Sequence, residues 1–486
     1  MLDISLWCGA ANFFQNDSVF MSTKKFNLPV FTIFLGTLVL YAPVLTHGFF
    51  WDDWVWIPWN PLLYSWHGLA KIWFNRFALE AYYPLTVTTF WLERHIWGLN
   101  PFGYHLVSVL LHATNAVLVG LILSKLDVRG AWLAAAIFAW HPIQVESVGW
   151  ITERKNVLSL FFYLLAILSY IRFYHLDALQ SGGFKQKKFY LLALLFFSCS
   201  ILSKPTACTF PFTVLILLWW KQNQIKRRDI FLLIPVFVLA LAVSFITILV
   251  ERVRIGTTST EFTWTFLERC SIAIKALYFY VGKLFWPTQL VLIYPKWEIH
   301  PSSFLFFSLL FILLIFVGLL KPMTKETKRG VITAVLFFMV SLAPTFSFFN
   351  VSFFTYSFVA NWWLYLPSIG LITLFSVSWE KFWDKLGTSG VPSFFKSIAT
   401  VLILLTLSSL TTERIWSYRN EENVWRAMVS ENPKSAAVHF NLGVILERKG
   451  KVLEAVNEYD QTLRLDPHHP GARNNLNLLT NSSRNV

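Results

Sequence analysis

Two adjacent carboxylates, Asp52 and Asp53, lie in the stretch FFWDDWVWI, directly after an apolar run over 28–48. Ionisable side chains at the mouth of a membrane segment are energetically costly and usually functional. In a pair of carboxyl groups, one can stay deprotonated as a general base while the other shares the proton or binds a metal. We therefore expect this pair to take a proton from an acceptor group.

A second cluster of charges lies in the stretch HPIQVESVGWITERKN over 141–156. Because Arg and Lys side chains can neutralise a phosphate, we interpret Arg154 and Lys155 as phosphate ligands that Glu146 and Glu153 hold in place. The alternative is a structural network of ion pairs and snorkelling side chains at the membrane surface. The further residues expected on this face are Arg94, as a third phosphate ligand, and His141, Tyr82 and Tyr83 in support.

A carboxylate base that faces a phosphate site suits the transfer of a group from a phospholipid-linked donor to a hydroxyl. The donor's tail lies in the bilayer and its head group reaches the surface. The phosphate leaves as an anion, so it needs a positive clamp or a metal ion. A divalent metal at Asp53 is therefore one option, and no cofactor is indicated with certainty.

The composition places these residues in a membrane protein. The chain has 486 residues, of which 55% are hydrophobic and 14% charged, whereas a soluble protein carries roughly 25% charged residues. The net charge is +14, from 41 basic and 27 acidic residues. The basic residues lie in loops between apolar runs, so we interpret them as topology signals and lipid head-group contacts, not as a nucleic-acid surface.

The apolar runs predict an all-α, polytopic domain over 28–413. A span needs about 20 mostly apolar residues, and about eleven stretches qualify. The stretch over 130–148 contains His141 and Pro142, so we expect its helix to break near its end. The predicted spans are 28–48, 103–124, 130–148, 157–174, 189–203, 206–220, 230–250, 303–320, 331–349, 361–378 and 396–413.

The distribution of Lys and Arg orients these spans. If the N-terminal segment over 1–27 is cytoplasmic, the basic loops lie inside, and the long segments over 49–102 and 251–302 lie outside. This orientation, in a cell (inner) membrane, places the acidic pair outside. The outside stretches LLYSWHGLAKIWF and LERCSIAIKALYFYVGKLFW suit helices in the head-group layer. Within 1–27, Met21 reads as a more natural start than Met1.

The polar C-terminal region, 414–486, contains a different architecture. Five residues fall at the offsets of a 34-residue tetratricopeptide repeat. Because three or more repeats are normally needed for stability, we expect this short array to pack on the membrane domain or on another protein. Such repeats bind extended peptides in a groove, so the region could hold an acceptor or partner protein. The repeat signature is Leu442, Gly443, Ala455, Tyr459 and Pro467.

Several further stretches, in chain order, carry a family resemblance. They are YYPLTVTTFWLERHIWGLNPFGYHLV, LSKPTACTFPFTVLILLWW, FYVGKLFWPTQLVLIYP, LAPTFSFFN and SFVANWWLYLPSIG. Together with the two charged stretches, they resemble bacterial relatives of the transmembrane and tetratricopeptide-repeat-containing O-mannosyltransferases, of the C-type (GT-C) glycosyltransferase superfamily. The resemblance implies about eleven spans, an acidic motif in the first outside loop and an inverting transfer from a polyprenyl-phosphate sugar. Asp52 would then be the catalytic base for a Ser or Thr hydroxyl, and Asp53 would orient it or hold a metal.

The chain departs from this family pattern at five positions, where it lacks a charged or titratable group. This leaves two readings open: an active mannose transferase, or a degenerate membrane scaffold whose repeats recruit a partner. A transporter is a third alternative, but charges near span midpoints and an internal repeat of spans are not seen. The five positions are Val87, Gln144, Thr355, Asn361 and Trp362.

Overall fold

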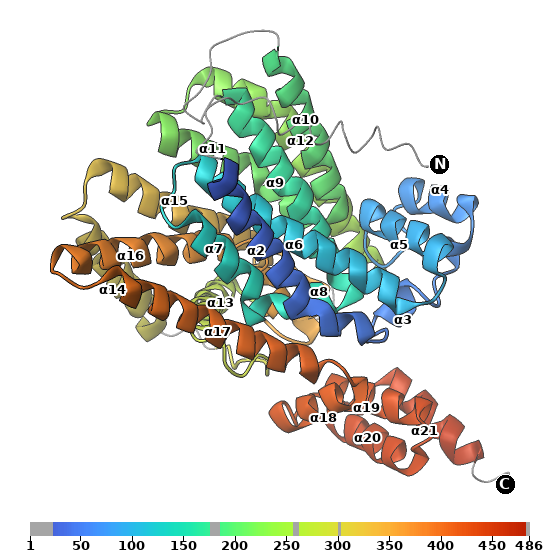
Figure 1. Ribbon diagram of the computed structural model, residues 1–486. Coiled ribbons are helices and arrows are strands. Elements are labelled where there is room, and N and C mark those ends of the chain that lie inside the picture. The colour runs from blue at the N-terminus through green and yellow to red at the C-terminus, as the bar shows by residue number, and fades with distance from the viewer. Residues whose placement is uncertain (1–22, 175–184, 256–261, 300–302, 483–486) are drawn as a thin grey trace.

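A computed structural model describes residues 23–174, 185–255, 262–299 and 303–482. Within these ranges the chain is helical and contains no strand, as predicted. Figure 1 shows a bundle of long helices from which four shorter helices, α18 to α21, extend at one end. The alternative start at Met21 lies outside the described residues.

Six helical stretches are long and apolar enough to cross a membrane: Leu28–Thr46, Pro101–Lys125, Ile151–Tyr174, Arg227–Val253, Lys325–Thr345 and Ser393–Ser417. They correspond to α6 (Pro101–Lys125), α9 (Arg154–Tyr174), α12 (Arg227–Val250), α15 (Lys325–Leu342), α17 (Ser393–Ser417) and the greater part of α2 (Thr23–Tyr41). The other predicted spans coincide with α7 (Ala131–Trp140), α10 (Lys185–Ser203), α11 (Phe210–Gln222), α14 (Ser303–Leu320) and α16 (Ser368–Thr388). A helix therefore lies in each of the eleven predicted ranges, and the spans beyond six stay a prediction.

Helices α6 and α9 form the centre of the bundle. They pack against each other, α9 also packs against α10, and α6 packs against α2 and α7 (Figure 1). Their sequences are apolar on nearly every face, which is typical of helices surrounded by other helices.

The predicted break after α7 is confirmed. The helix ends at Trp140, and His141 is extended because the residue before a proline is disfavoured in helical conformation. The His141 Nδ1 atom accepts a hydrogen bond from the Ile143 amide at 3.2 Å, and Nε2 bonds to the Leu284 carbonyl at 3.0 Å. Both ring nitrogens are thus occupied in shaping the turn into η3 (Pro142–Gln144) and α8 (Val145–Gly149).

The two long segments predicted outside are helical. The first folds into the short helices α3 (Asp53–Trp56), η2 (Pro61–Tyr64), α4 (Trp66–Phe74) and α5 (Pro84–Trp97), and the second contains the longer helix α13 (Phe266–Phe285). Asn60 and Ser65 cap η2 and α4, accepting hydrogen bonds from the Leu62 and Gly68 amides at 3.1 and 3.0 Å. The first segment encloses a small apolar core of its own, which includes Val87.

The C-terminal region is compatible with the predicted repeat. It consists of α18 (Glu421–Glu431), α19 (Ala436–Arg448), α20 (Val452–Leu465) and α21 (Pro470–Ser482). Leu442, Ala455 and Tyr459 are buried, and a Cβ atom at Gly443 would lie 2.7 Å from the Tyr459 ring. Gly443 therefore allows α19 and α20 to approach closely, while exposed Pro467 follows α20. Helix α17 continues to Ser417, past the predicted boundary at 413.

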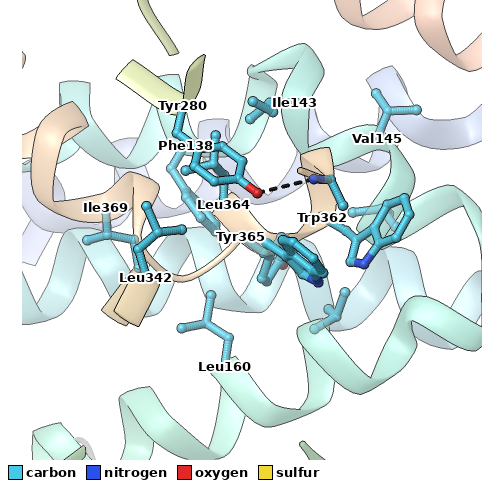
Figure 2. Packing of buried hydrophobic residues seen from close by; sticks show 14 of the residues in the cluster. Phe138, Ile143, Val145, Leu160, Tyr280, Leu342, Trp362, Leu364, Tyr365 and Ile369 are labelled. Atoms are coloured by element: carbon cyan, nitrogen blue, oxygen red, sulfur yellow. Dashed lines mark hydrogen bonds between the residues drawn. The ribbon is translucent and has the colours of Figure 1, made fainter. Parts of the chain in front are cut away.

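The segment before α16 is held in the centre of the core. Figure 2 shows Trp362 and Leu364 of η10 (Asn361–Leu364), and Tyr365 directly after it, among buried side chains of several helices. The Tyr280 hydroxyl accepts a hydrogen bond from the Ala360 amide at 3.1 Å (Figure 2). This connection fixes the irregular backbone that leads to the candidate site.

Candidate functional site

The acidic pair is held by the segment around Thr152. Asp52 Oδ1 accepts hydrogen bonds from Trp150 Nε1 at 2.8 Å and from Thr152 Oγ1 at 2.6 Å. Asp53 Oδ2 accepts from the Phe50 amide at 3.0 Å, and Oδ1 accepts from the Thr152 amide at 2.7 Å and contacts the Thr152 hydroxyl. The structure thus brings together the two charged stretches that the sequence singled out.

The two carboxyl groups differ in exposure and in pKa. Asp53 is fully buried, whereas Asp52 is half-buried and its Oδ2 atom accepts no hydrogen bond from the residues that the structure describes. Burial raises the pKa of Asp53 to about 8, with repulsion from Asp52 as the second cause. Burial raises the pKa of Asp52 only to about 6, because attraction to Lys155 opposes it.

The Thr152 hydroxyl contacts both carboxyl groups but has a single proton to donate. The second contact is satisfied when one carboxyl is protonated and donates to the hydroxyl oxygen. The pKa order favours Asp53 as the protonated member and Asp52 as the ionised one. The arrangement therefore supplies one carboxylate with a free oxygen, which is what a general base requires.

A metal ion does not fit this geometry. Both oxygens of Asp53 already accept backbone hydrogen bonds. Among the described residues, no three His, Cys, Asp or Glu side chains are grouped so that they could hold a metal. The option of a divalent metal at Asp53 therefore has no support in the donor set.

Lys155 is the cation that the structure places beside the pair. Its Nζ atom lies 2.5 Å from Glu153 Oε1 and 5.8 and 5.9 Å from the ring centres of Tyr83 and Trp150. Tyr83, one of the predicted supporting residues, thus forms part of this aromatic surround. Attraction between Lys155 and Asp52 helps to keep Asp52 ionised.

Arg154 lies elsewhere. It is fully buried, forms an ion pair with Glu93, donates to the Tyr104 carbonyl and bonds Ser108 Oγ at 3.1 Å. We expected Glu146 and Glu153 to hold Arg154 and Lys155; Glu153 does pair with Lys155, whereas Arg154 pairs with Glu93. Because its guanidinium is occupied by these partners, the structure does not bring Arg154 to the acidic pair.

Glu146 joins the membrane domain to the end of α17. Its Oε1 atom accepts hydrogen bonds from Arg414 at 2.5 Å, and from Asn361 and the Tyr418 hydroxyl at 2.9 Å. Asn361 also donates to the Val291 carbonyl at 2.9 Å. An aspartate at 361 could not donate to Glu146, so the departure from the family pattern at Asn361 is structurally satisfied.

The other predicted residues and departures make local contacts. The Tyr82 hydroxyl donates to the Trp73 carbonyl at 3.1 Å, and the Arg94 guanidinium lies 4.6 Å from the Tyr64 ring centre. Neither contact reaches the acidic pair. The Gln144 amide donates to Ser368 Oγ at 3.1 Å and the Thr355 hydroxyl to the Ser352 carbonyl at 2.8 Å, while Trp362 meets Trp150 edge to face at 5.3 Å.

The first helix of the repeat region contacts the acidic segment directly. The Trp51 amide donates to Glu421 Oε1 at 2.9 Å, and the Trp51 ring stacks on Trp150 at 5.2 Å and meets Trp425 at 5.3 Å. Trp51 has a φ of 48°, a left-handed conformation that is strained for a residue with a side chain. These contacts hold the strained residue next to Asp52, so the repeats and the acidic pair lie on one side of the molecule.

Comparison with known proteins gives similarity to one group of enzymes. The chain is 27% identical over 448 residues to human protein O-mannosyl-transferase TMTC1, covering 82% of this chain and 50% of the relative. It is 26% identical to protein O-mannosyl-transferase F38B6.6 of Caenorhabditis elegans (89% and 62% covered) and 25% identical to human TMTC3 (93% and 53%). The chain thus spans about half to three fifths of the length of these curated relatives.

No protein-family model and no solved structure matches the chain. The relatives named here are animal proteins, so the bacterial source that the resemblance implied stays a prediction. Sequence reasoning missed Thr152, Trp150 and Glu421, although the first two lie inside the quoted stretch around Glu153. Glu421 carries no local signal, because it meets Trp51 only through the fold.

Proposed function

Since the chain is a relative of the TMTC protein O-mannosyltransferases, we propose that it is a membrane glycosyltransferase. It moves a monosaccharide, mannose, from a polyprenyl-phosphate donor to a Ser or Thr hydroxyl of a protein. The observation that carries the proposal is the Asp52 carboxylate, ionised near neutral pH, with one oxygen free and Lys155 close by.

In the proposed reaction, Asp52 takes the proton of the acceptor hydroxyl. The hydroxyl oxygen forms a bond to the anomeric carbon of the sugar, and the bond from that carbon to the phosphate oxygen breaks, which inverts the configuration. The polyprenyl phosphate leaves with the electron pair of the broken bond, and a cation near the site stabilises the departing anion. Asp53 and Thr152 orient Asp52 and take no part in the bond changes.

The proposed topology follows from the basic loops. The N-terminus is cytoplasmic, and the acidic pair and the repeats face the outer side of the inner membrane. The contact between Trp51 and Glu421 supports a common side for the pair and the repeats. In this position the repeats can hold an acceptor or partner protein near Asp52, and membrane lipid surrounds the apolar helices. A reporter fused after Val486 should be active on the outer side, and activity in the cytoplasm would reverse the topology.

The test is transfer of radiolabelled mannose from polyprenyl phosphate to a Ser/Thr-rich peptide by the purified full chain. Asp52→Asn should lower the rate by roughly 10²- to 10⁴-fold, the usual contribution of a general base. Asp384→Asn is the matched control, because Asp384 is exposed and forms a surface ion pair with Arg129. Transfer by Asp52→Asn at the unmodified rate would show that another group is the base.

A degenerate scaffold is the second candidate, and the five departures favour it. At positions 361 and 362 the resemblance implies a charged or titratable group, yet Asn361 is hydrogen-bonded and Trp362 is packed against Trp150 without one. A chain that binds the lipid donor but transfers no sugar from it would support the scaffold. Transfer that depends on Asp52 would exclude it.

A further inference from the structure

Lys204 is a buried cation without a carboxylate partner. Only 8% of its surface is exposed, at the turn between α10 and η5 (Pro205–Thr209). Its Nζ atom donates to Asn156 Oδ1, and it forms no ion pair within 4.0 Å with any residue that the structure describes. The ammonium has three protons to donate, so it retains unused capacity to bind an acceptor.

The carboxylates near Lys204 are directed to Lys155. Asn156 Nδ2 donates to Glu153 Oε2 at 2.5 Å, and Glu153 Oε1 is already paired with Lys155 at 2.5 Å. Asp52, the second carboxylate of this region, also attracts Lys155. Lys204 is therefore the ammonium group without a direct carboxylate contact, and because burying an unpaired charge is unfavourable, a bound anion would stabilise it.

A hollow lies beside Lys204 and has a polar lining. Its volume, measured as the space open to the centres of water-sized spheres, is about 30 Å³, whereas a single water needs about 10–15 Å³ on this measure. The Thr206 hydroxyl lines it and makes no hydrogen bond to another described residue. The lining also contains apolar and aromatic side chains; Figure 2 shows three of them, Leu160, Trp362 and Tyr365.

A chain of contacts connects the hollow to the acidic pair. Trp362 lines the hollow and meets Trp150 edge to face at 5.3 Å. Trp150 in turn donates to Asp52 Oδ1 at 2.8 Å. The hollow beside Lys204 and the Asp52 carboxyl group are thus linked through one pair of tryptophan rings.

We infer that the hollow binds the phosphate of a lipid-linked phosphate, with Lys204 and Thr206 as its donors. The inference rests on the proposed function and identifies the place of the donor's phosphate. Lys204 fills this role better than Lys155, because Glu153 already neutralises Lys155. It also fills it better than Arg154, whose guanidinium is occupied by Glu93 and Tyr104.

The test is the binding of sugar-free polyprenyl phosphate to the full chain in detergent, which is measured by the quenching of tryptophan fluorescence. Lys204→Met should weaken binding by roughly 10- to 100-fold, the loss expected for a hydrogen bond to a charged group. Lys204→Arg keeps the charge and should bind within a few-fold of the unmodified chain. The matched control is Lys221→Met, because Lys221 is also partly buried but lies beside Asp127, away from the hollow.

Three competitors identify the ligand. Polyprenol, which lacks the phosphate, should not compete; inorganic phosphate should compete only weakly; and phosphatidylglycerol vesicles should not displace the probe. Equal binding of polyprenol, or unchanged binding by Lys204→Met, would overturn the inference. Displacement by phosphatidylglycerol would instead assign the hollow to ordinary lipid head groups.

Two further results separate this inference from the proposed function. Lys204-dependent binding without any sugar transfer would leave the phosphate site standing and remove the transferase. Sugar transfer that depends on Asp52, together with normal polyprenyl phosphate binding by Lys204→Met, would support the transferase and rule out the phosphate site at Lys204. The unfolding temperature of each variant is measured without ligand, so that lost binding by a Lys204→Met chain that unfolds within a few degrees of the unmodified chain reports the site and not the fold.

Discussion

The ion pair between Arg154 and Glu93 offers the sharpest test of the site assignment. The sequence suggests a phosphate ligand at Arg154, whereas the structure buries it completely with Glu93, the Tyr104 carbonyl and Ser108 as partners. Replacing one partner of a buried ion pair costs about 3–5 kcal/mol, because the other charge is left unpaired. Arg154→Met should therefore destabilise the fold without a direct effect on phosphate binding.

The size of this effect can be expressed as a temperature. An unfolding entropy of about 2.1 cal/mol/K per residue gives about 1 kcal/mol/K for 486 residues. A loss of about 3–5 kcal/mol then lowers the unfolding temperature by at least about 3–5 °C, since membrane helices retain structure and lose less entropy per residue. The double variant Glu93→Gln/Arg154→Met should be more stable than Arg154→Met alone, because it leaves no unpaired charge.

The assay is thermal unfolding in detergent followed by tryptophan fluorescence, combined with the polyprenyl phosphate binding measurement. Arg129→Met is the matched control, because its ion pair with Asp384 is exposed and contributes about 0–1 kcal/mol. An unchanged unfolding temperature for Arg154→Met, together with lost phosphate binding, would refute the structural role and restore the phosphate ligand.

Three further predictions concern the acidic segment. The pKa of Asp53 in the folded chain is raised to about 8, so the folded chain keeps a proton that the unfolded chain loses near pH 4. The free energy of unfolding should therefore fall as the pH rises from about 4 to about 8. Thermal unfolding of Asp53→Asn over this pH range should lack this part of the fall. Thr152→Val removes a hydrogen bond to ionised Asp52 and should raise the pKa of the proposed base. The acidic limb of the pH–rate profile for sugar transfer should then move up by about 1–2 pH units. An acidic limb at the same pH as in the unmodified chain would contradict this prediction. Glu421→Leu leaves the Trp51 amide without its acceptor, at a cost of about 1–3 kcal/mol. Limited proteolysis should therefore separate the repeats from the membrane domain faster in Glu421→Leu than in Glu421→Gln, which keeps an acceptor oxygen. Equal rates of proteolysis would show that this contact does not hold the repeats.

Several features of the fold can be read from local patterns in the sequence. The long apolar runs predict the helices, the His141–Pro142 pair predicts the break after α7, and the spacing of Leu442, Gly443 and Tyr459 predicts the packed pair α19 and α20. Each of these depends on residues within one or two helical turns of one another, or within one short repeat. The physical causes are helical periodicity, the steric demands of proline and the close approach allowed by glycine, all of which act over short distances.

The candidate site could be predicted only in part. The residue types of Asp52 and Asp53 beside an apolar run are enough to select the pair, because charge near a bilayer is costly. Which member is ionised could not be predicted. That depends on burial and on the contacts of each carboxyl group, which come from a segment about 100 residues further along the chain.

The sequence by itself determined that this is a helical membrane protein with a paired acid and a short repeat region. Tertiary structure alone decided the partners of the buried polar groups: Glu93 for Arg154, Glu421 for the Trp51 amide, and Asn156 for Lys204, which has no carboxylate within 4.0 Å in the part of the chain that the structure describes. The physical reason is that burial and charge pairing depend on distance in space, whereas residue spacing along the chain fixes only the local conformation. Arg154, which the sequence suggests as a phosphate ligand, is therefore engaged within the core, whereas Lys204, which the sequence analysis did not select, is the cation left without a carboxylate contact.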